Sequence, residues 1–227
     1  MTRRAEKMRL AWRGLPRRRA ELASSLRLLG DLRDLGWQLS VRAGSPIDQD
    51  GGPLPWMNYG AISVLDSIVR RSTRVFEYGS GYSTVWLNQR SDCVHGVEHD
   101  PAWHERLKRM DTGGHGFAVR CIPCGGDSLD APPDDPYVNA PGDVDGPHGF
   151  DLIIVDGLAR RTCLQVVDRY LRPGGVVVLD DAERMAVQGA RRMMQEEKGF
   201  RELAITGPKP AFGHLVTTTF YLPLGLL

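Results

Sequence analysis

Apolar side chains near the start of the chain recur every three or four positions, which is the spacing of one face of an α-helix. This pattern predicts helix through residues 1–42. Residues 45–55 are rich in glycine and proline and predict a turn-rich linker, after which the helical pattern resumes. The apolar positions are Leu22, Leu26, Leu29, Leu32 and Leu35 in the first stretch, and Ile62, Leu65, Ile68 and Val69 in the second.

Short apolar runs alternate with helical patterns through the rest of the chain. The runs at about residues 74–77, 94–98, 117–122, 150–157 and 176–180 predict strands, and the segments between them predict helices. Two further runs, GFRELAIT and LVTTTFYL, predict late strands joined by GPKPAFGH. Alternating strands and helices indicate an α/β fold with a largely parallel sheet. Residues 130–149, crowded with proline, glycine and aspartate, predict a mobile loop over the ligand side of that sheet.

The end of the first predicted strand carries an acid and two closely spaced glycines. The sequence VFEYGSGYST places Glu77, Gly79 and Gly81 directly before a helix, and Glu98 ends the next strand, 21 residues after Glu77. Two such units side by side suit a ligand that carries a nucleoside, bound at the carboxyl ends of a parallel sheet. Glycines allow the backbone to approach such a ligand closely. A nicotinamide-binding domain would have a third glycine where this chain has Thr84.

This arrangement resembles the first motif of the class I S-adenosylmethionine-dependent methyltransferases, E/D-x-G-x-G, and YLRPGGVVVLDD resembles their approach to the fifth strand. The resemblance covers roughly residues 56–223. It implies a Rossmann-like, doubly wound, seven-stranded sheet, mostly parallel with a C-terminal antiparallel hairpin, and S-adenosylmethionine as cofactor. It also implies cofactor-binding roles for Glu77, Gly79, Gly81 and Ser83 near the methionine part, Glu98 on the ribose with His99 beside it, Asp127 and Ser128 at the adenine, and Asp156.

Three more acids lie at the ends of the fourth and fifth predicted strands. Asp156, Asp180 and Asp181 should meet at one edge of the cofactor site, because these strands are neighbours in the usual sheet order. An all-oxygen ligand set suits Mg²⁺. The pattern resembles the cation-dependent small-molecule O-methyltransferases, in which the ion would anchor and acidify a hydroxyl. Alternatively, Arg160 and Arg161 could neutralise the acids without a metal, leaving Asp156 or Asp181 as a catalytic base. The first motif is two residues shorter than in the catechol-type enzymes, and no lysine closely follows Asp156.

Charged residues are distributed unevenly along the chain. Residues 1–42 hold 11 basic and 4 acidic residues, whereas the whole 227-residue chain has a formal net charge of only +1. We therefore expect a basic helical extension at residues 1–45 and a methyltransferase domain at residues 46–227. One interpretation of the basic extension is a solvated helix whose leucines pack on the domain. The alternative is contact with a nucleic acid, an anionic surface or another subunit, as in a homo-oligomer formed through this helix.

The substrate that these features favour is a small molecule. We expect methyl transfer to a hydroxyl of a sugar or secondary metabolite, with N-methylation, nucleic-acid methylation or an inactive cofactor-binding scaffold as alternatives. No apolar run is long enough for a transmembrane segment, and the first residues lack the apolar stretch of a secretory signal, which predicts a cytoplasmic protein. Trp56 and Tyr59 are candidates for the walls of the substrate cleft.

Overall fold

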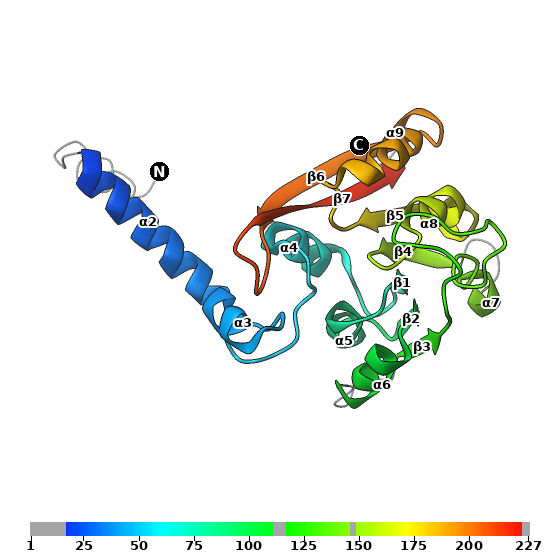
Figure 1. The fold of residues 1–227 in the computed structure, drawn as a ribbon, viewed down its shortest axis with the longest axis horizontal. Coiled ribbons are helices and arrows are strands. Elements are labelled where there is room, and N and C mark those ends of the chain that lie inside the picture. Colours follow the sequence, from blue (N-terminus) through cyan, green and yellow to red (C-terminus); the bar gives the residue numbers. More distant parts are fainter. Residues whose placement is uncertain (1–16, 111–116, 146–148, 224–227) are drawn as a thin grey trace.

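The computed structural model describes residues 17–110, 117–145 and 149–223, and it begins with two helices that precede the sheet. These helices are α2 (Arg17–Asp34) and α3 (Trp37–Ala43). Gly36 separates them with a φ of +83°, a left-handed conformation that favours glycine. The predicted helical stretch is therefore two helices, and its residues 1–16 lie outside the described residues. Figure 1 shows α2 extending away from the sheet.

A single seven-stranded sheet forms the body of the molecule, in the order β3-β2-β1-β4-β5-β7-β6. Strand β7 runs antiparallel to both β5 and β6, and the pairs among β1 to β5 are parallel. The predicted fold class is confirmed. The strands are β1 (Arg74–Tyr78), β2 (Cys93–Glu98), β3 (Ala118–Cys121), β4 (Phe150–Val155), β5 (Leu171–Leu179), β6 (Phe200–Pro208) and β7 (Leu215–Pro223).

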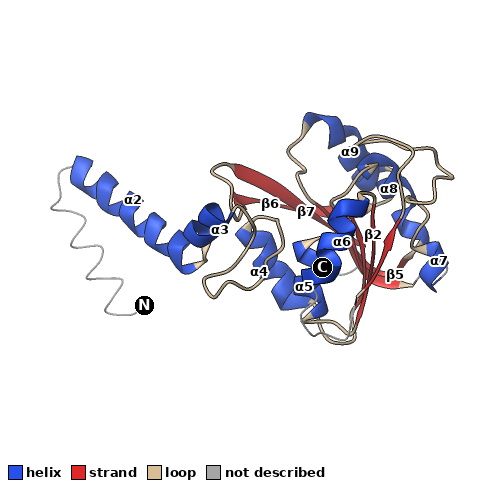
Figure 2. Cartoon of the chain, turned by 60° about the horizontal axis from the view of Figure 1, so that its bottom comes forward, coloured by secondary structure: helices blue, strands red, loops and turns tan. Residues whose placement is uncertain are grey.

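Helices cover both faces of this sheet, as Figure 2 shows. One face carries α4 (Tyr59–Ile68), α5 (Tyr82–Asn88) and α6 (Pro101–Met110), and the other carries α7 (Gly142–Asp145), α8 (Arg160–Val166) and α9 (Gln188–Glu196). Two short 3₁₀ turns, η1 (Val167–Arg169) and η2 (Met185–Val187), follow α8 and precede α9.

The core is divided by the sheet because successive side chains of a strand point to opposite faces. Val75 of β1 packs with Trp86 of α5 in the cluster on one face. Phe76 and Tyr78 belong to the cluster on the other face, with α8 and α9. Both faces of β1 and β4 are buried, which explains why their sequences are apolar runs without alternation.

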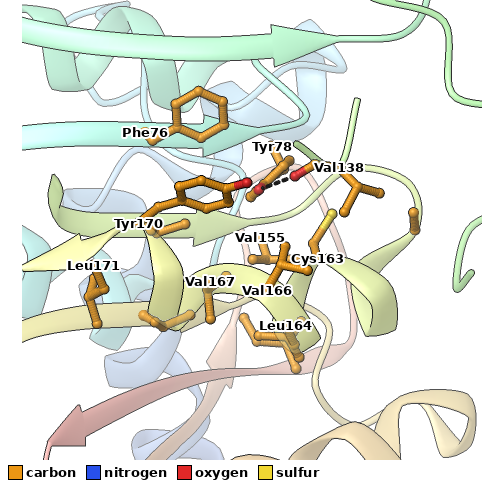
Figure 3. Close-up of a cluster of buried hydrophobic side chains, with 14 of the residues drawn as sticks. Phe76, Tyr78, Val138, Val155, Cys163, Leu164, Val166, Val167, Tyr170 and Leu171 are labelled. Atoms are coloured by element: carbon orange, nitrogen blue, oxygen red, sulfur yellow. Dashed lines mark hydrogen bonds between the residues drawn. The ribbon is translucent and has the colours of Figure 1, made fainter. Parts of the chain in front are cut away.

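The expectation of a mobile loop at residues 130–149 is wrong for its described part. Tyr137, Val138 and Ala140 are fully buried in the second cluster. The Tyr78 hydroxyl donates a hydrogen bond to the carbonyl oxygen of Val138 at 2.7 Å, within the cluster shown in Figure 3. Proline and aspartate marked this segment as irregular, but its buried aromatic and aliphatic side chains attach it to the core.

Strand β5 begins earlier than predicted, at Leu171 instead of near Val176. Its register against β4 shifts between Phe150 and Leu152, so the sequence RPGG lies inside the strand as an irregularity rather than in a separate turn. Gly174 adopts a φ of +84° there, which glycine accommodates without strain.

No helix in the described ranges is both long enough and apolar enough to span a bilayer. The predicted cytoplasmic location stays a prediction.

Candidate functional site

A cavity of about 450 Å³ opens beside the carboxyl ends of β1, β2 and β4. The strand order reverses between β1 and β4, since β2 lies on one side of β1 and the chain returns on the other. Open α/β sheets bind their ligands at this kind of position. The lining residues are Trp56, Gly79, Ser80, Gly81, Tyr82, Ser83, Glu98, His99, Asp100, Trp103, Ser128, Asp156, Gly157, Leu158, Arg160 and Arg184.

Two glycines shape the turn between β1 and α5 for different reasons. Gly79 has a φ of +82°, and a Cβ atom there would overlap the backbone of Gly157, directly after β4. Gly79 therefore lets two strand ends approach each other, a requirement that comes from the protein itself. At Gly81 a Cβ would lie 3.6 Å from the nearest atoms, in the ring of Trp103, which is ordinary van der Waals contact.

Glu77 does not line the cavity, although the sequence placed it near the cofactor. Its side chain is fully buried and accepts a hydrogen bond from the Thr84 hydroxyl, which itself accepts from the Gly81 N–H at 2.8 Å. Burial raises the pKa of Glu77 to about 7. Its Oε1 has no hydrogen-bond partner among the described residues. Glu77 and Thr84 together thus fix the β1–α5 turn through hydrogen bonds. This role explains why the chain has threonine at the position where a nicotinamide-binding domain would have its third glycine.

Glu98 lies at the end of β2 and reaches the cavity with one carboxylate oxygen already engaged. Its Oε1 accepts the backbone N–H groups of His99 and Asp100, both at 2.8 Å. Within the described part of the chain, no donor is recorded for Oε2. Burial raises the pKa of Glu98 above its ordinary value. A carboxylate fixed through one oxygen leaves the other in place for a ligand hydroxyl.

Of the two residues predicted to contact the adenine, only one lines the cavity. Ser128 lines the cavity. Asp127 does not, because its carboxylate accepts the backbone N–H groups of Leu129 and Asp130 and so closes its own turn. Local hydrogen bonding of this kind is common for aspartate in turns.

Aromatic side chains form much of the cavity wall, and sequence reasoning found only one of them. Trp56 lines the cavity as predicted, whereas Tyr59 does not. Trp103 was missed; its Nε1 donates to the carbonyl oxygen of Ser80 at 2.9 Å, which joins α6 to the glycine turn. Its position on the helix that follows Glu98 was the available signal.

The three acids after β4 and β5 do come together, as predicted. One carboxylate oxygen from each of Asp156, Asp180 and Asp181 lies within 4.8 Å of the others. Only Asp156 reaches the cavity; Asp180 is fully buried, and the Asp181 side chain is 11% exposed.

Cationic side chains already contact all three acids. Arg160 Nη2 lies 3.0 Å from Asp156 Oδ1, and its Nη1 lies 3.5 Å from Asp181 Oδ2. Arg184 also pairs with Asp181. Arg161, the other candidate, pairs with Asp130 instead.

Lys209, from the loop between β6 and β7, is the partner that sequence reasoning missed. Its Nζ lies 2.9 Å from Asp180 Oδ2 and 3.1 Å from Asp181 Oδ1. The only signal was a lysine in GPKPAFGH, 28 residues beyond Asp181. No local pattern relates the two positions.

The pKa values of the acids follow from burial and from these cations. Burial, together with the neighbouring Asp180, raises the pKa of Asp156 well above its ordinary value. Burial likewise raises the pKa of Asp180. For Asp181 burial acts in the same direction, but Lys209 and Arg160 outweigh it and lower the pKa. The oxygen atoms suit Mg²⁺ in number and spacing. However, the Lys209 ammonium lies between the carboxylates of Asp180 and Asp181, in the space that the ion would need. The Mg²⁺ site stays a prediction.

Comparison with known proteins agrees with this geometry. Residues 76–182 match a family described as a methyltransferase domain. A catechol O-methyltransferase of Mycobacterium tuberculosis is 30% identical over 155 residues, which cover 60% of this chain and 66% of that protein. The matched region thus spans slightly less than two thirds of that relative.

Solved structures extend the similarity of the fold. The O-methyltransferase TomG from Streptomyces achromogenes, in complex with S-adenosylmethionine, has a TM-score of 0.50 at 20% identity, covering 69% of this chain and 75% of that one. The tRNA methyltransferase TrmI from Aquifex aeolicus has a TM-score of 0.53 at 14% identity, covering 74% and 70%. At these identities the similarity establishes the fold, which is shared by enzymes with unrelated acceptors.

Proposed function

We propose that this chain is a class I S-adenosylmethionine-dependent methyltransferase, which transfers the methyl group of its cofactor to a hydroxyl of a small molecule. The proposal rests on one observation: Glu98, the glycine turn and Asp156 all line the same cavity. A volume of about 450 Å³ lies in the range of small-molecule sites.

Several cavity residues are suited to hold S-adenosylmethionine, which supplies a methyl group on a positively charged sulfur. In this proposal Glu98 accepts the ribose hydroxyls through its unengaged oxygen, with His99 beside it. Gly79, Gly81 and Ser83 contact the methionine part, and Ser128 contacts the adenine. Glu77 does not contact the cofactor in this proposal; it stabilises the glycine turn through its hydrogen bond with the Thr84 hydroxyl. Asp127 closes the turn that carries Ser128.

Asp156 is the proposed catalytic base, because it is the acid of the cluster that lines the cavity. A raised pKa suits a base that works near neutral pH. It would take the proton of the acceptor hydroxyl as the oxygen bonds to the methyl carbon and the carbon–sulfur bond breaks. Asp181, the second predicted catalytic residue, is better placed to orient Arg160 and Lys209, which both contact it.

Oxygen as the acceptor atom is supported by the name of the catechol O-methyltransferase and by the acid beside the cavity. Within this class, a sugar or secondary metabolite hydroxyl is the substrate that we propose. N-methylation is the alternative for which Asp156 would be dispensable, because an amine can attack without a base. Methylation of a nucleic acid would instead need the basic segment at residues 1–42.

The first experiment tests the cofactor site. We expect S-adenosylhomocysteine to bind the wild-type chain in calorimetry, and Glu98→Gln to weaken its Kd by roughly tenfold to a hundredfold, because one acceptor of a charged hydrogen bond is lost. Glu105→Gln, which removes an exposed carboxylate on α6, should leave the Kd unchanged. Absence of binding to the wild-type chain would overturn the proposal.

The second experiment tests the base. In assays with a panel of phenols, sugars and amines, Asp156→Asn should abolish transfer to hydroxyls while calorimetry still detects the cofactor product. Equal loss of transfer to amines would argue against a role in deprotonation. Transfer to hydroxyls at the wild-type rate would exclude Asp156 as the base.

A further inference from the structure

Lys209 reaches into the acid cluster from a distant part of the chain. It directly follows β6, and its side chain is 9% exposed. The ammonium lies within hydrogen-bonding distance of both Asp180 and Asp181. Those two carboxylates come from the end of β5, on the opposite side of β7 from β6 in the sheet order. The contact therefore exists only because the loop after β6 folds over the end of the sheet.

The loop that carries Lys209 is itself fixed by hydrogen bonds. The carbonyl oxygen of Pro210 accepts from Trp56 Nε1 at 2.9 Å, and that of Phe212 accepts from Trp37 Nε1 at 2.8 Å. Trp56 also packs against Phe212, with ring centroids 5.5 Å apart and the ring planes tilted by 49°. A lysine held in this way is positioned in the cluster rather than sampling it from solvent.

Charge is balanced within the cluster without any added ion. Three carboxylates face three cations among the described residues: Arg160, Arg184 and Lys209. A divalent ion coordinated by the same oxygens would lie next to the Lys209 ammonium, and like charges at such distances in a buried site repel strongly. The ion could enter only if the lysine left, and a buried ion pair is costly to break.

We propose that Lys209 takes the place of a divalent cation in this site, so that the acid cluster is a closed ion-pair network and the reaction does not depend on a metal. Lys209 is a positioning residue: with Arg160 it holds Asp181 and Asp180 fixed behind Asp156, the acid at the cavity. The statement about the reaction rests on the proposed methyl transfer, whereas the statement about the cluster does not.

Binding of Mn²⁺, followed by electron paramagnetic resonance on the full chain, tests the proposal without any assay of activity. We expect the wild-type protein to bind no Mn²⁺ at the cluster. Lys209→Ala removes the ammonium, which leaves space and takes away the cation that pairs with Asp180. This variant should therefore gain one Mn²⁺ per chain, with binding at least about tenfold tighter than in the wild type. Lys209→Arg restores the charge and should again exclude the ion.

A matched control is available in the turn between α9 and β6. Lys198 also pairs with an aspartate, Asp168, and is largely shielded, but it lies outside the cluster. Lys198→Ala should not gain Mn²⁺. One equivalent of Mn²⁺ bound by the wild-type protein, or no gain in a folded Lys209→Ala variant, would overturn the proposal. If the Lys209→Ala variant does not fold, the wild-type measurement still decides.

Chelation separates this proposal from the proposed function. Methyl transfer by the wild-type chain should be unchanged in EDTA, and loss of transfer that added Mg²⁺ restores would overturn metal independence. If no acceptor is methylated under any condition, the proposed function fails, while the Mn²⁺ result for Lys209 keeps its meaning.

Discussion

At the scale of single residues, Glu77 carries a buried charge whose cost depends on pH. Its pKa is 4.5 in an ordinary setting and about 7 in the folded chain, because burial disfavours the ionised form. Below pH 4.5 the carboxyl is protonated whether the chain is folded or unfolded, and above about pH 7 it is ionised in both. Folding stability should therefore fall as pH rises between these values, by roughly 3 kcal/mol from this group.

The variant Glu77→Gln removes that dependence while keeping an acceptor for the Thr84 hydroxyl. In urea unfolding of the cofactor-free chain, the wild type should lose about 3 kcal/mol relative to Glu77→Gln between pH 4.5 and pH 8. Glu196→Gln, at an exposed position of α9, controls for the loss of a carboxylate. A constant difference between wild type and Glu77→Gln at the two pH values would contradict the prediction.

The sequence indicated which residues end the strands, but not all of their contacts. Glu98, Gly79 and Asp156 reach the cavity as predicted because strand ends in a parallel sheet share one edge. Asp127 does not, since a turn aspartate can bond to its own backbone as readily as to a ligand. Lys209 could not be predicted, because its contact with Asp180 joins residues 29 apart through the folding of a loop.

At the scale of elements, the turn between β1 and α5 makes different demands on its two glycines. Gly79→Ala would place a Cβ in a left-handed conformation and against the Gly157 backbone, so we expect it to destabilise the fold by roughly 3 kcal/mol or more. Gly81→Ala adds a methyl group at ordinary contact distance and should change the free energy of unfolding by less than about 0.5 kcal/mol.

Unfolding of these two variants by urea, side by side with the wild type, measures the difference. Similar stabilities for Gly79→Ala and Gly81→Ala would mean that β1 and β4 do not need their close approach. A large loss for Gly81→Ala would show instead that this position is constrained by more than Trp103.

Element types were predictable because each strand of the core is a distinct apolar run, and β1 to β4 begin within two residues of their predicted starts. Boundaries set by long-range pairing were not. The RPGG segment reads as a turn locally, yet Leu171 pairs with Phe150 and so starts β5 early. In the same way, the buried Tyr137 gives residues 130–145 a place in the core that their proline content concealed.

At the scale of the whole molecule, α2 extends away from the sheet, as Figure 1 shows. Several of its leucines are exposed. Leu22, Leu26 and Leu29 share one helical face and are 61%, 59% and 45% exposed. An isolated helix of 18 residues has marginal stability in water. Residues 1–42 are basic, with 11 basic and 4 acidic residues, whereas the rest of the chain has a net negative charge.

These features favour a second copy of the chain as the partner of α2, because it offers both a matching leucine face and an acidic body. We expect the wild-type chain to sediment as a dimer at micromolar concentration, and the triple variant Leu22→Gln, Leu26→Gln, Leu29→Gln to sediment as a monomer. Arg27→Gln changes the opposite face of the same helix and should leave the dimer intact. A wild-type monomer, or a triple variant that still dimerises, would place the contact elsewhere. Salt distinguishes the two contributions, since charge attraction weakens with ionic strength and leucine packing does not.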